Sequence, residues 1–438
     1  MTMRQDHDIK IFFQYVIPSV LSFALSGVYA IVDGFFIGNS IGDLGLSAVN
    51  IAYPIVGVIQ ALGTGIGMGG AIYYSIYKAE KKEEQAKNFI AGALWVLIIS
   101  SVLATILGFL LNSTLLRLLG AGGELLALGK EYIAVIALGA STQVIGTGLV
   151  PFIRNQGGSF YAMVSMIAGF ASNIILDYLF VWRLGQGVPG AAWATVIGQG
   201  VTMLTALAWL LCKKQFTLNI PFSKFGKVSA SVLKIGIAPF GLTMSPNISL
   251  TIINRFSVSY GGEQAVAVYA CIAYAICIVY LILQGVGDGS QPLLSRYYGE
   301  GNYDRLKSTR KLAYLFALFL SLVSCIIMYL TKGSLGALFG ASDVVNAEIA
   351  KIMPVFLVSV PFVAVLRITT ASFYATERSV LSYILTFMEP LLMFVLMLIL
   401  PPLSGGQNMI WWSTVFARIL SAVSAILLKQ HVDKRETP

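Results

Sequence analysis

Charged side chains are scarce in this sequence, and their scarcity excludes an ordinary water-soluble domain. Of 438 residues, only 11% are charged and 57% are hydrophobic. Soluble globular domains carry about 25% charged residues. Apolar stretches of about 20 or more residues recur along the chain, long enough to cross roughly 30 Å of hydrocarbon as helices. The composition therefore predicts an integral membrane protein.

Histidine and cysteine are also rare, and their positions exclude several kinds of site. The two histidines, His7 and His431, belong to the tails, which argues against an intramembrane catalytic or metal centre. The four cysteines lie in or beside apolar stretches, without C-x-x-C spacing: Cys212, Cys271, Cys277 and Cys325. We expect them to be small buried apolar side chains, not disulfides or metal ligands.

No nucleotide-binding signature or catalytic group stands out. The stretch from Gly123 to Lys130 lacks the spacing of a phosphate-binding loop and the Ser or Thr that should follow it. ATP hydrolysis by this chain is therefore not expected. The apolar stretches contain no catalytic histidine, metal cluster or Ser/Lys pair, so we expect a protein that is not an enzyme and needs no cofactor.

The apolar stretches predict an all-α integral membrane fold. We identify twelve, centred near residues 25, 60, 100, 140, 171, 200, 246, 280, 320, 360, 390 and 418. Each is long enough for one transmembrane helix. The N-terminal segment MTMRQDHDIKIFFQYV lacks a small-residue cleavage site. We therefore expect the first apolar stretch to be a retained helix rather than part of a signal peptide.

Lysine and arginine are distributed unevenly over the connections. With the N-terminus in the cytoplasm, the cytoplasmic connections would hold most of them, including Lys78, Lys81, Lys82, Lys87, Lys213, Lys214, Lys224, Lys227, Lys234, Arg296, Arg305, Lys307, Arg310 and Lys311. The opposite side would hold few: Arg117, Lys130, Arg183, Lys332 and Lys351. This positive-inside pattern predicts a multi-pass protein of the cell (inner, cytoplasmic) membrane with both termini in the cytoplasm. The net charge of +9 then indicates contact with anionic lipid rather than nucleic acid.

The chain contains an internal repeat. The stretch PSVLSFALSGVYAIVDGFF, from Pro18, aligns with PFGLTMSPNISLTIINRFS, from Pro239, at an offset of 221, which places Asn254 opposite Asp33. The glycine-rich stretches GIGMGGAIYYSIYKAE and GVGDGSQPLLSRYYGE align at an offset of 220. Each half has an even number of spans, so both begin on the same side and the repeats are parallel.

The repeat predicts two pseudo-symmetric six-helix lobes. We place them at residues 1–212 and 235–438, joined by a cytoplasmic linker of residues 213–234. The linker is polar and basic and contains Pro221 and Gly226. Duplicated halves are common in secondary transporters, which bind their substrates at the interface between the repeats.

Polar residues inside the apolar stretches form one set of candidate site residues. Acidic residues in spans are costly and mark ion or substrate pathways. Asp33 has Tyr29 one helical turn before it, and Asp177 has Asn173 four residues before it, on the same helix face. Thr195 lies in the following span. The oxygens of Asp33, Asn173, Asp177 and Thr195 suit Na⁺, while two neighbouring carboxyl groups away from water could instead hold a proton. For Tyr29, Asn173 and Thr195, interhelical packing explains the pattern equally well.

A second set of residues fits cavity-lining, gating or purely structural roles. Asp288 lies in a glycine-rich turn of the eighth span, and Glu389 precedes Pro390. Pro18 and Pro239 open equivalent helices, and Pro18 lies roughly 22 Å from Asp33 at helical rise. A bend near Pro18 could accompany ion binding at Asp33, or serve packing alone.

These residues resemble the MATE (multidrug and toxic compound extrusion) family, in its DinF-like and MepA-like bacterial branch. The likeness covers almost the whole chain and includes VDGFFIGNSIGDLGLSAVNIAYP and the G-x-G-x-G segments of the second and eighth spans. In the DinF-like branch a cation site combines an Asp and Tyr of the first helix, an Asn and Asp of the fifth, and a Thr of the sixth. The resemblance assigns this role to Asp33, Tyr29, Asn173, Asp177 and Thr195.

The resemblance implies efflux of organic cations and drugs by antiport with H⁺ or Na⁺, in a working monomer. A cation entering from outside would occupy Asp33 and Asp177, reshape the first helix and release the organic cation from a cavity between the lobes. NorM-like members carry an acid eight residues beyond the proline of the seventh helix. This chain has Asn247 there, so a second cation site of that type is not expected.

A flippase for lipids or lipid-linked oligosaccharides, from the same superfamily, is the alternative. It would share the two lobes but need a more basic cavity, for which Arg367 and Arg418 are the candidates. For cavity or gating roles we retain one further list of residues: Pro18, Asn247, Asn254, Asp288 and Glu389.

Overall fold

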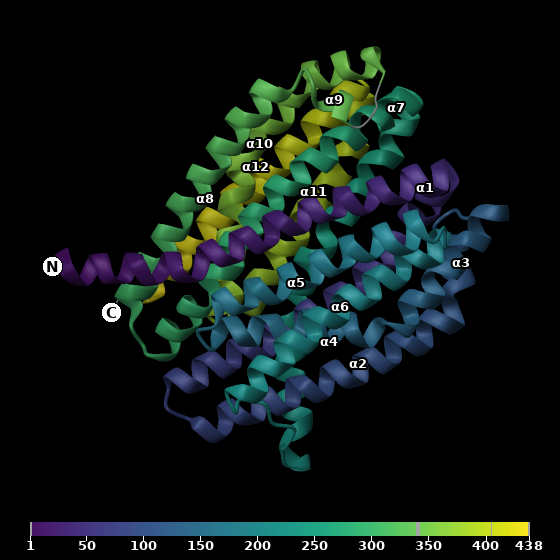
Figure 1. The fold of residues 1–438 in the computed structure, drawn as a ribbon. Coiled ribbons are helices and arrows are strands. Elements are labelled where there is room, and N and C mark those ends of the chain that lie inside the picture. The colour runs from purple at the N-terminus through teal and green to yellow at the C-terminus, as the bar shows by residue number, and fades with distance from the viewer. Residues whose placement is uncertain (1, 339–341, 404, 437–438) are drawn as a thin grey trace. The chain divides into compact units, whose positions relative to one another are not determined.

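The computed structural model describes residues 2–338, 342–403 and 405–436. The elements follow in chain order: α1 (Thr2–Ala79), α2 (Glu83–Leu118), α3 (Gly123–Leu138), α4 (Ala140–Asn155), α5 (Ser159–Asp177), the π-helix η1 (Tyr178–Arg183), α6 (Gly187–Cys212), α7 (Phe222–Gly299), α8 (Tyr303–Thr331), α9 (Leu335–Leu338), α10 (Asp343–Ala375), α11 (Ser379–Leu403) and α12 (Gln407–Glu436) (Figure 1).

The helices of the described residues confirm the predicted membrane fold. Eleven are long and apolar enough to span a membrane, and there are twelve if α3 and α4, bent by 56° at their junction, form one span. The long helices α1 and α7 each supply two spans: His7–Gly42, Leu44–Ala79, Phe222–Gly262 and Gln264–Gly299. Each of the twelve centres of apolar stretches in the sequence falls inside one of the eleven helices or the bent pair.

Gly42 and Gly262 divide the two long helices. Gly42 has φ 78° and ψ −170°, and Gly262 has φ 66° and ψ −162°. Residues with side chains almost never adopt this combination, so each break requires glycine. The two glycines are 220 residues apart, like the first residues of α2 and α8, of α5 and α11, and of α6 and α12. The repeat seen in the sequence is therefore also a repeat of helix boundaries.

The chain forms two compact units that differ from the predicted lobes. One contains residues 17–244 and 295–301, and the other contains residues 1–16, 245–294 and 302–438. The first sixteen residues thus pack with the C-terminal half, where Phe13 stacks edge-on against Phe316 at 5.2 Å and Asp8 pairs with Arg305 at 3.4 Å. Residues 222–244, partly assigned to a linker, are helical and pack with the N-terminal half.

Pro18 and Pro239 lie inside long helices, not at the openings that the sequence indicated. Helix α1 begins at Thr2 and α7 at Phe222, because the helix continues on the N-terminal side of each proline. The Ser22 hydroxyl donates to the Pro18 carbonyl at 2.7 Å, and Thr243 donates to the Pro239 carbonyl at 2.9 Å. Proline removes one helix hydrogen bond, and such back-bonded hydroxyls often accompany a bend. Both halves therefore carry the same weak point in their first helix.

The glycine-rich segments are helical and are not the turns that we expected. A Cβ atom on Gly65 would lie 2.7 Å from the Gly236 carbonyl oxygen, and one on Gly69 would lie 2.2 Å from the Val232 carbonyl oxygen. The glycines thus let the backbones of α1 and α7 touch, which is a common use of small residues between membrane helices.

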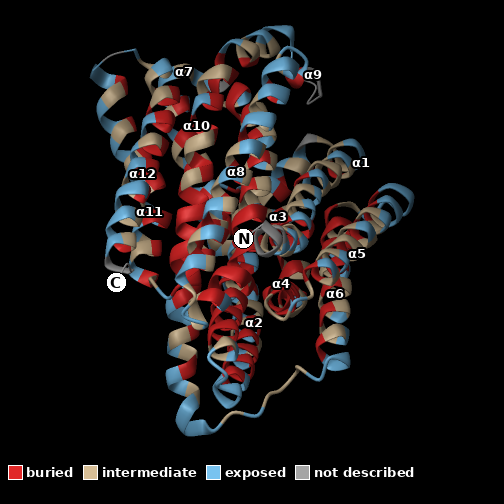
Figure 2. Ribbon diagram, turned by 90° about the vertical axis from the view of Figure 1, so that its left-hand side faces the viewer, coloured by how far each residue is buried: buried red, intermediate tan, exposed pale blue. Residues whose placement is uncertain are grey.

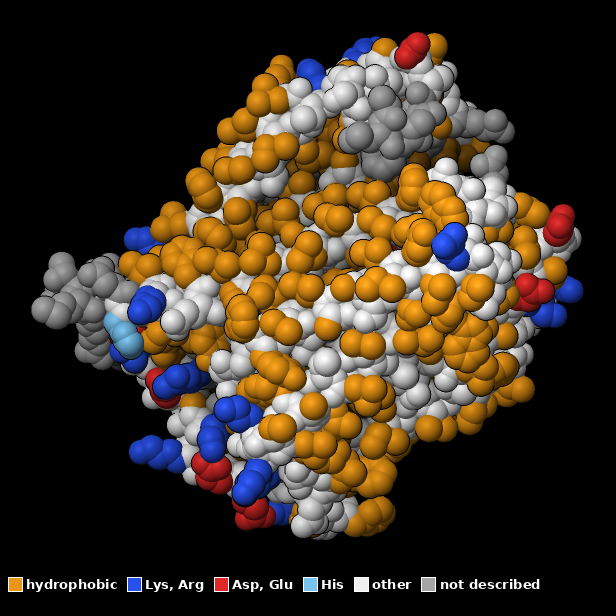
Figure 3. Space-filling view, in the orientation of Figure 1, with side chains coloured by type: hydrophobic (Ala, Val, Ile, Leu, Met, Phe, Trp, Pro, Cys, Tyr) orange, Lys and Arg blue, Asp and Glu red, His pale blue; other side chains and the backbone are white. Residues whose placement is uncertain are grey.

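Large apolar side chains cover the outer faces of the helices (Figure 3). Leu110 and Leu330 are 73% and 76% exposed. The inner faces, which Figure 2 shows as buried, contain both large apolar side chains such as Phe152 and Phe356 and polar residues such as Ser359 and Thr370. The expectation of buried cysteines is wrong. Cys212, the last residue of α6, and Cys277 are exposed, and Cys271 and Cys325 are half-buried.

Candidate cation site

Three helices of the N-terminal half bring the predicted cation-site residues together. Asp33 lies in the first span of α1, and Asp177 is the last residue of α5. Both lie nearer the C-terminal end of their spans than the centre. Asn173 lies one turn before Asp177, and Thr195 is in α6. Asn173, Asp177 and Thr195 are all buried.

The carboxyl groups of Asp33 and Asp177 lie within hydrogen-bonding reach of each other. With both groups ionised, no donor among the described residues reaches Asp33 Oδ1 or either Asp177 carboxylate oxygen. These atoms are enclosed, as is Asn173 Oδ1, which also has no partner there. Enclosed acceptors without donors cost free energy. The arrangement therefore suits a proton or a small cation between the two carboxyl groups.

Neighbouring hydroxyl and amide groups orient the site. Asn173 Nδ2 donates to Thr195 Oγ1 at 3.4 Å, and Thr195 Oγ1 donates to the Ala191 carbonyl at 3.1 Å. The Asn173 amide is thereby turned so that its oxygen remains available. Tyr29 stacks on Phe170 of α5, with ring centroids 5.1 Å apart and planes 9° apart, and its hydroxyl reaches Thr195. The stacking fixes α1 against α5 one turn before Asp33.

Tyr132 of α3 also belongs to the site, and sequence reasoning missed it. This tyrosine is buried, and its hydroxyl reaches Thr195. It is close enough to Asp33 and Asp177 to interact with both electrostatically. The sequence around it, GKEYIAVIAL, carries no signal other than a single tyrosine in an apolar run. Only the packing of α3 against α6 shows its role.

A change of helix type follows Asp177. Helix α5 ends there, and the π-helix η1 continues from Tyr178 to Arg183. Single π-helical turns are rare and are frequently found at functional sites. The rings of Tyr178 and Trp182 pack with Phe36, at centroid distances of 6.5 Å and 5.7 Å. The aromatic packing holds η1 against α1 beside the two carboxyl groups.

Glycines let α5 and α6 approach closely next to the site. A Cβ atom on Gly198 would lie 2.8 Å from the Gly169 carbonyl oxygen and 2.9 Å from Asn173 Cβ. Both distances are shorter than the contacts that real Cβ atoms make, so a side chain at Gly198 would force the backbone to move. The close contact sets the distance between Asn173 and Thr195.

The other candidate residues are not brought to this site. Asn247 and Asn254 are half-buried in α7, where Asn254 Oδ1 is enclosed without a partner among the described residues. Asp288 is buried in a different network. It accepts hydrogen bonds from Gln284 and Tyr374, both at 2.9 Å. Gln284 in turn accepts from Arg367 at 3.0 Å.

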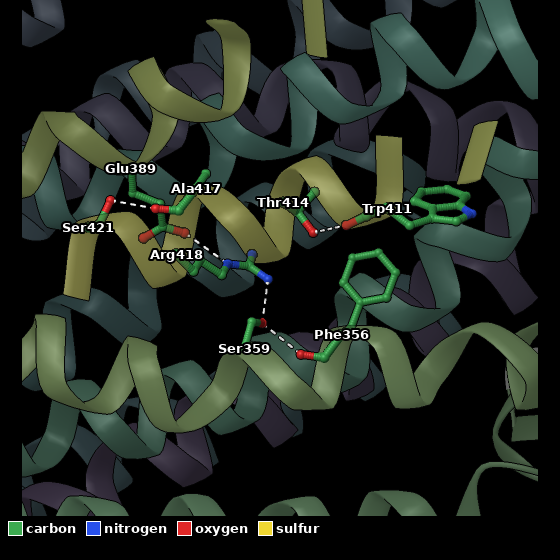
Figure 4. A network of polar contacts seen from close by, with 8 residues as sticks. All are labelled: Phe356, Ser359, Glu389, Trp411, Thr414, Ala417, Arg418 and Ser421. Atoms are coloured by element: carbon green, nitrogen blue, oxygen red, sulfur yellow. Dashed lines mark hydrogen bonds and ion pairs between the residues drawn. The ribbon is translucent and has the colours of Figure 1, made fainter. Parts of the chain in front are cut away.

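Glu389 forms a buried ion pair with Arg418. The distance from Arg418 Nε to Glu389 Oε1 is 3.0 Å, and Arg418 Nη1 donates to Ser359 Oγ at 3.1 Å (Figure 4). Both arginines considered for a basic cavity therefore have polar partners, Glu389 for Arg418 and Gln284 for Arg367.

Repeated halves and an enclosed acidic pair in a helical membrane protein with many spans are typical of transport proteins. Comparison with known sequences identifies the family. The MatE family model matches twice, at residues 18–179 and 239–400. The chain belongs to the MatE family. The two matches repeat the offset of 221 between Pro18 and Pro239.

Relatives and solved structures agree with this assignment. The chain is 24% identical over 416 residues to the multidrug export protein MepA of Staphylococcus saprophyticus, covering 94% of this chain and 92% of the relative. It is 25% identical over 422 residues to MepA of Staphylococcus aureus, covering 96% and 93%.

Two solved structures share the fold. One is an outward-facing multidrug resistance MATE family transporter of the MOP superfamily, with a TM-score of 0.90, 24% identity, and coverage of 98% of this chain and 96% of that chain. The other is a MOP superfamily transporter from Pyrococcus furiosus, described as having a binding pocket of reversed polarity. Its TM-score is 0.92, with 24% identity and coverage of 98% and 97%.

Proposed function

We propose that this protein is a secondary antiporter that exports organic cations and other drugs in exchange for H⁺ or Na⁺, and that it is not an enzyme. The enclosed pair of Asp33 and Asp177, without donors, carries the proposal. The names of the relatives, multidrug export proteins, support the substrate class. The coupling cation and the organic cation are both cargo of the exchange.

The geometry links cation occupancy to helix packing. Two ionised carboxyl groups enclosed side by side repel one another and lack the solvation that water would give. A proton or cation between them removes this cost and draws α1 towards α5. The arrangement of α1 is then more stable with the cation than without it. A ligand shifts a conformational equilibrium only through such a difference in binding free energy.

Helix α1 provides the route from the site to the rest of the transporter. Asp33 and Pro18 lie in the same span, and the Ser22 hydroxyl caps the Pro18 carbonyl beside the weak point. A change in the packing of Asp33 can therefore be relieved by bending near Pro18 rather than by breaking the helix. In this proposal the bend reshapes the cavity from which the organic cation leaves, with Asn247, Asn254, Asp288 and Glu389 outside the coupling site.

The same residues accommodate either cation. A proton requires only the carboxyl groups of Asp33 and Asp177. Na⁺ would add the oxygens of Asn173 and Thr195, which are the ligand types that hard cations take. The Asn173 oxygen is enclosed and without a partner among the described side chains, as a Na⁺ ligand requires.

The location and orientation also form part of the proposal. We place the protein in the cell membrane, surrounded by lipid and working as a monomer, with both termini in the cytoplasm. The distribution of Lys and Arg supports this orientation. Figure 3 shows few Lys and Arg side chains among the many hydrophobic ones on the face that it draws.

Exchange in proteoliposomes tests the proposed function. Vesicles that contain the protein and a fluorescent organic cation such as ethidium are given a pH gradient or a Na⁺ gradient in separate experiments. Gradient-driven ethidium movement under one gradient identifies the coupling cation. If neither gradient moves ethidium but the protein scrambles a fluorescent lipid, the flippase alternative replaces the proposal.

A further inference from the structure

Three helices of the C-terminal half meet at a buried charged cluster. Arg418 of α12 contacts Glu389 of α11 and Ser359 of α10 (Figure 4). Arg418 is 3% exposed and Glu389 7%, so both charges are withdrawn from solvent and lipid. The Ser359 hydroxyl donates onward to the Phe356 carbonyl at 2.6 Å, which leaves its oxygen to accept from Arg418.

Other groups complete the surroundings of the ion pair. The Arg418 guanidinium lies 5.1 Å from the centroid of the Tyr280 ring of α7, within the range of a cation–π contact. The remaining titratable and charged groups that interact with the pair or with Tyr280 are Tyr269 and Arg367, and Cys277 interacts in turn with these two. None of these three supplies a second carboxylate. Glu389 therefore has Arg418 as its counter-ion.

The repeat shows what stands at the same positions in the N-terminal half. At the offset of 220 that relates the starts of α3 and α10 and of α5 and α11, Ser359 and Glu389 correspond to Gly139 and Gly169. In α6 and α12 the stretches WATV, from Trp193, and WSTV, from Trp412, align at an offset of 219, which places Gln199 opposite Arg418. These glycines sit at tight contacts. A Cβ atom on Gly139 would lie 2.2 Å from Val196 Cγ2, and one on Gly169 would lie 2.0 Å from Thr202 Oγ1. Ser359 and Glu389 thus take the place of two close-packed glycines, and Arg418 takes the place of a glutamine.

The reverse substitution occurs at the cation site. At the offset of 220 Asn173 and Asp177 correspond to Met393 and Met397, which are apolar and fully buried, whereas the counterpart of Thr195 is again a threonine, Thr414. The N-terminal half has buried acids with no built-in cation. The C-terminal half has one buried acid in its last three helices, and a cation of the chain itself is bound to it.

We propose that Arg418 is a fixed internal cation that permanently neutralises Glu389, so that the meeting point of α10, α11 and α12 takes up no coupling ion. The proposal rests on the proposed antiport and adds that this buried acid takes no part in the ion exchange. Arg418 is a positioning residue that holds α10, α11 and α12 together without exchanging its charge.

Thermal unfolding of the purified protein in detergent tests the internal cation without any transport. The wild type is compared with Arg418→Met, Arg418→Lys and the double variant Glu389→Gln/Arg418→Met. In Arg418→Met, Glu389 can remain buried only by holding a proton that the unfolded chain releases, so stability falls as pH rises. We expect its melting temperature to fall relative to the wild type by several degrees between about pH 5 and pH 8. The double variant and Arg418→Lys should follow the pH profile of the wild type.

Cation-driven exchange provides the second readout. The double variant has no charge at the pair and should keep the cation dependence of the wild type, whereas Arg418→Met should show a steeper dependence because a second acid must be neutralised. If Arg418→Met does not fold at neutral pH, we expect it to fold at acidic pH or after addition of Glu389→Gln. Either result would equally support a Glu389 charge that Arg418 neutralises.

Two results would overturn the inference. One is a folded double variant that has lost cation-driven exchange, which would show that the pair takes part in coupling. The other is an Arg418→Met variant whose melting temperature depends on pH in the same way as that of the double variant. This would mean that the pair contributes packing but no charge neutralisation. If the wild type performs no exchange, the proposed antiport fails while the unfolding profiles still decide the role of Arg418.

Discussion

Asp33 in α1 and Asp177 at the end of α5 come from distant parts of the chain and bring their carboxyl groups within hydrogen-bonding reach. Both groups are enclosed, and no donor among the described residues reaches three of their four oxygens. Proteins avoid unpaired charges in apolar surroundings, since the desolvation cost amounts to several kcal/mol per ion. The pair is therefore understandable as a site whose partner arrives from solution.

Removal of the Tyr132 hydroxyl should weaken cation binding without abolishing transport. Tyr132→Phe takes one hydrogen-bonding group from Thr195, and such a bond contributes about 0.5–1.5 kcal/mol. We expect the cation concentration for half-maximal exchange to rise by roughly 2–12-fold. Tyr161→Phe is the matched control, because Tyr161 donates to the Thr205 carbonyl at 3.1 Å away from the site. Equal effects of the two variants would remove Tyr132 from the cation site.

A methyl group at Gly198 should disturb the site through packing. In Gly198→Ala the new Cβ would meet the Gly169 carbonyl oxygen and Asn173 Cβ, which forces α5 and α6 apart. Overpacking of this kind costs about 1–3 kcal/mol, and we expect a lower melting temperature together with weaker cation dependence. Gly226→Ala is the control, because Gly226 is exposed with no atom within 4 Å of its Cβ position. That variant should be as stable as the wild type or slightly more stable. A fully active and stable Gly198→Ala variant would contradict the role of this contact.

The two glycine breaks should respond alike to substitution. Gly42→Ala and Gly262→Ala each place a side chain in a backbone region that is essentially reserved for glycine, at a cost of about 1–3 kcal/mol. Melting temperatures in detergent measure this cost. Gly34→Ala in the same helix as Gly42 has open space around its Cβ position and ordinary helical geometry, so it should show no loss. Unchanged stability in both kink variants would mean that the breaks can be rebuilt without glycine.

The hydroxyl groups beside the helix prolines should influence the rate of exchange. Ser22→Ala leaves the Pro18 carbonyl without its side-chain donor and should change how readily α1 bends there, and Thr243→Ala should do the same at Pro239 in α7. Because the proposed coupling runs through α1, we expect Ser22→Ala to slow cation-driven exchange more than Thr243→Ala. Initial rates at saturating cation measure the difference. A larger effect of Thr243→Ala would place the coupling bend in α7.

The sequence was sufficient for the membrane fold because hydrophobic length is a strong signal. Each predicted span is a long, predominantly apolar run, and the repeat is visible as aligned prolines and glycines. The spacing of Asn173 and Asp177 predicted a shared helix face, and the structure places both beside Asp33 and Thr195. Most residues of the candidate site could therefore be predicted from local periodicity in the sequence.

The remaining features depend on contacts between distant segments. Tyr132 comes from a helix without any polar pattern, and the partner of Glu389 lies in another span, so neither relation has a local signature. Residues 1–16 belong to the compact unit of the C-terminal half, and residues 222–244 belong to that of the N-terminal half. No local pattern in the sequence indicates this assignment. The sequence placed Pro18 at a helix start because proline favours that position, whereas packing of the preceding apolar residues extends α1 beyond it.

The reciprocal exchange experiment tests the central claim most directly. An imposed gradient of ethidium should drive H⁺ or Na⁺ in the opposite direction across proteoliposomes that contain the wild type, measured with a trapped pH- or Na⁺-sensitive dye. Asp33→Asn and Asp177→Asn should reduce this movement to that of protein-free vesicles, whereas Asp304→Asn, at an exposed residue of α8, should leave it unchanged. Cation movement that persists in both Asp33→Asn and Asp177→Asn would contradict coupling through this carboxyl pair.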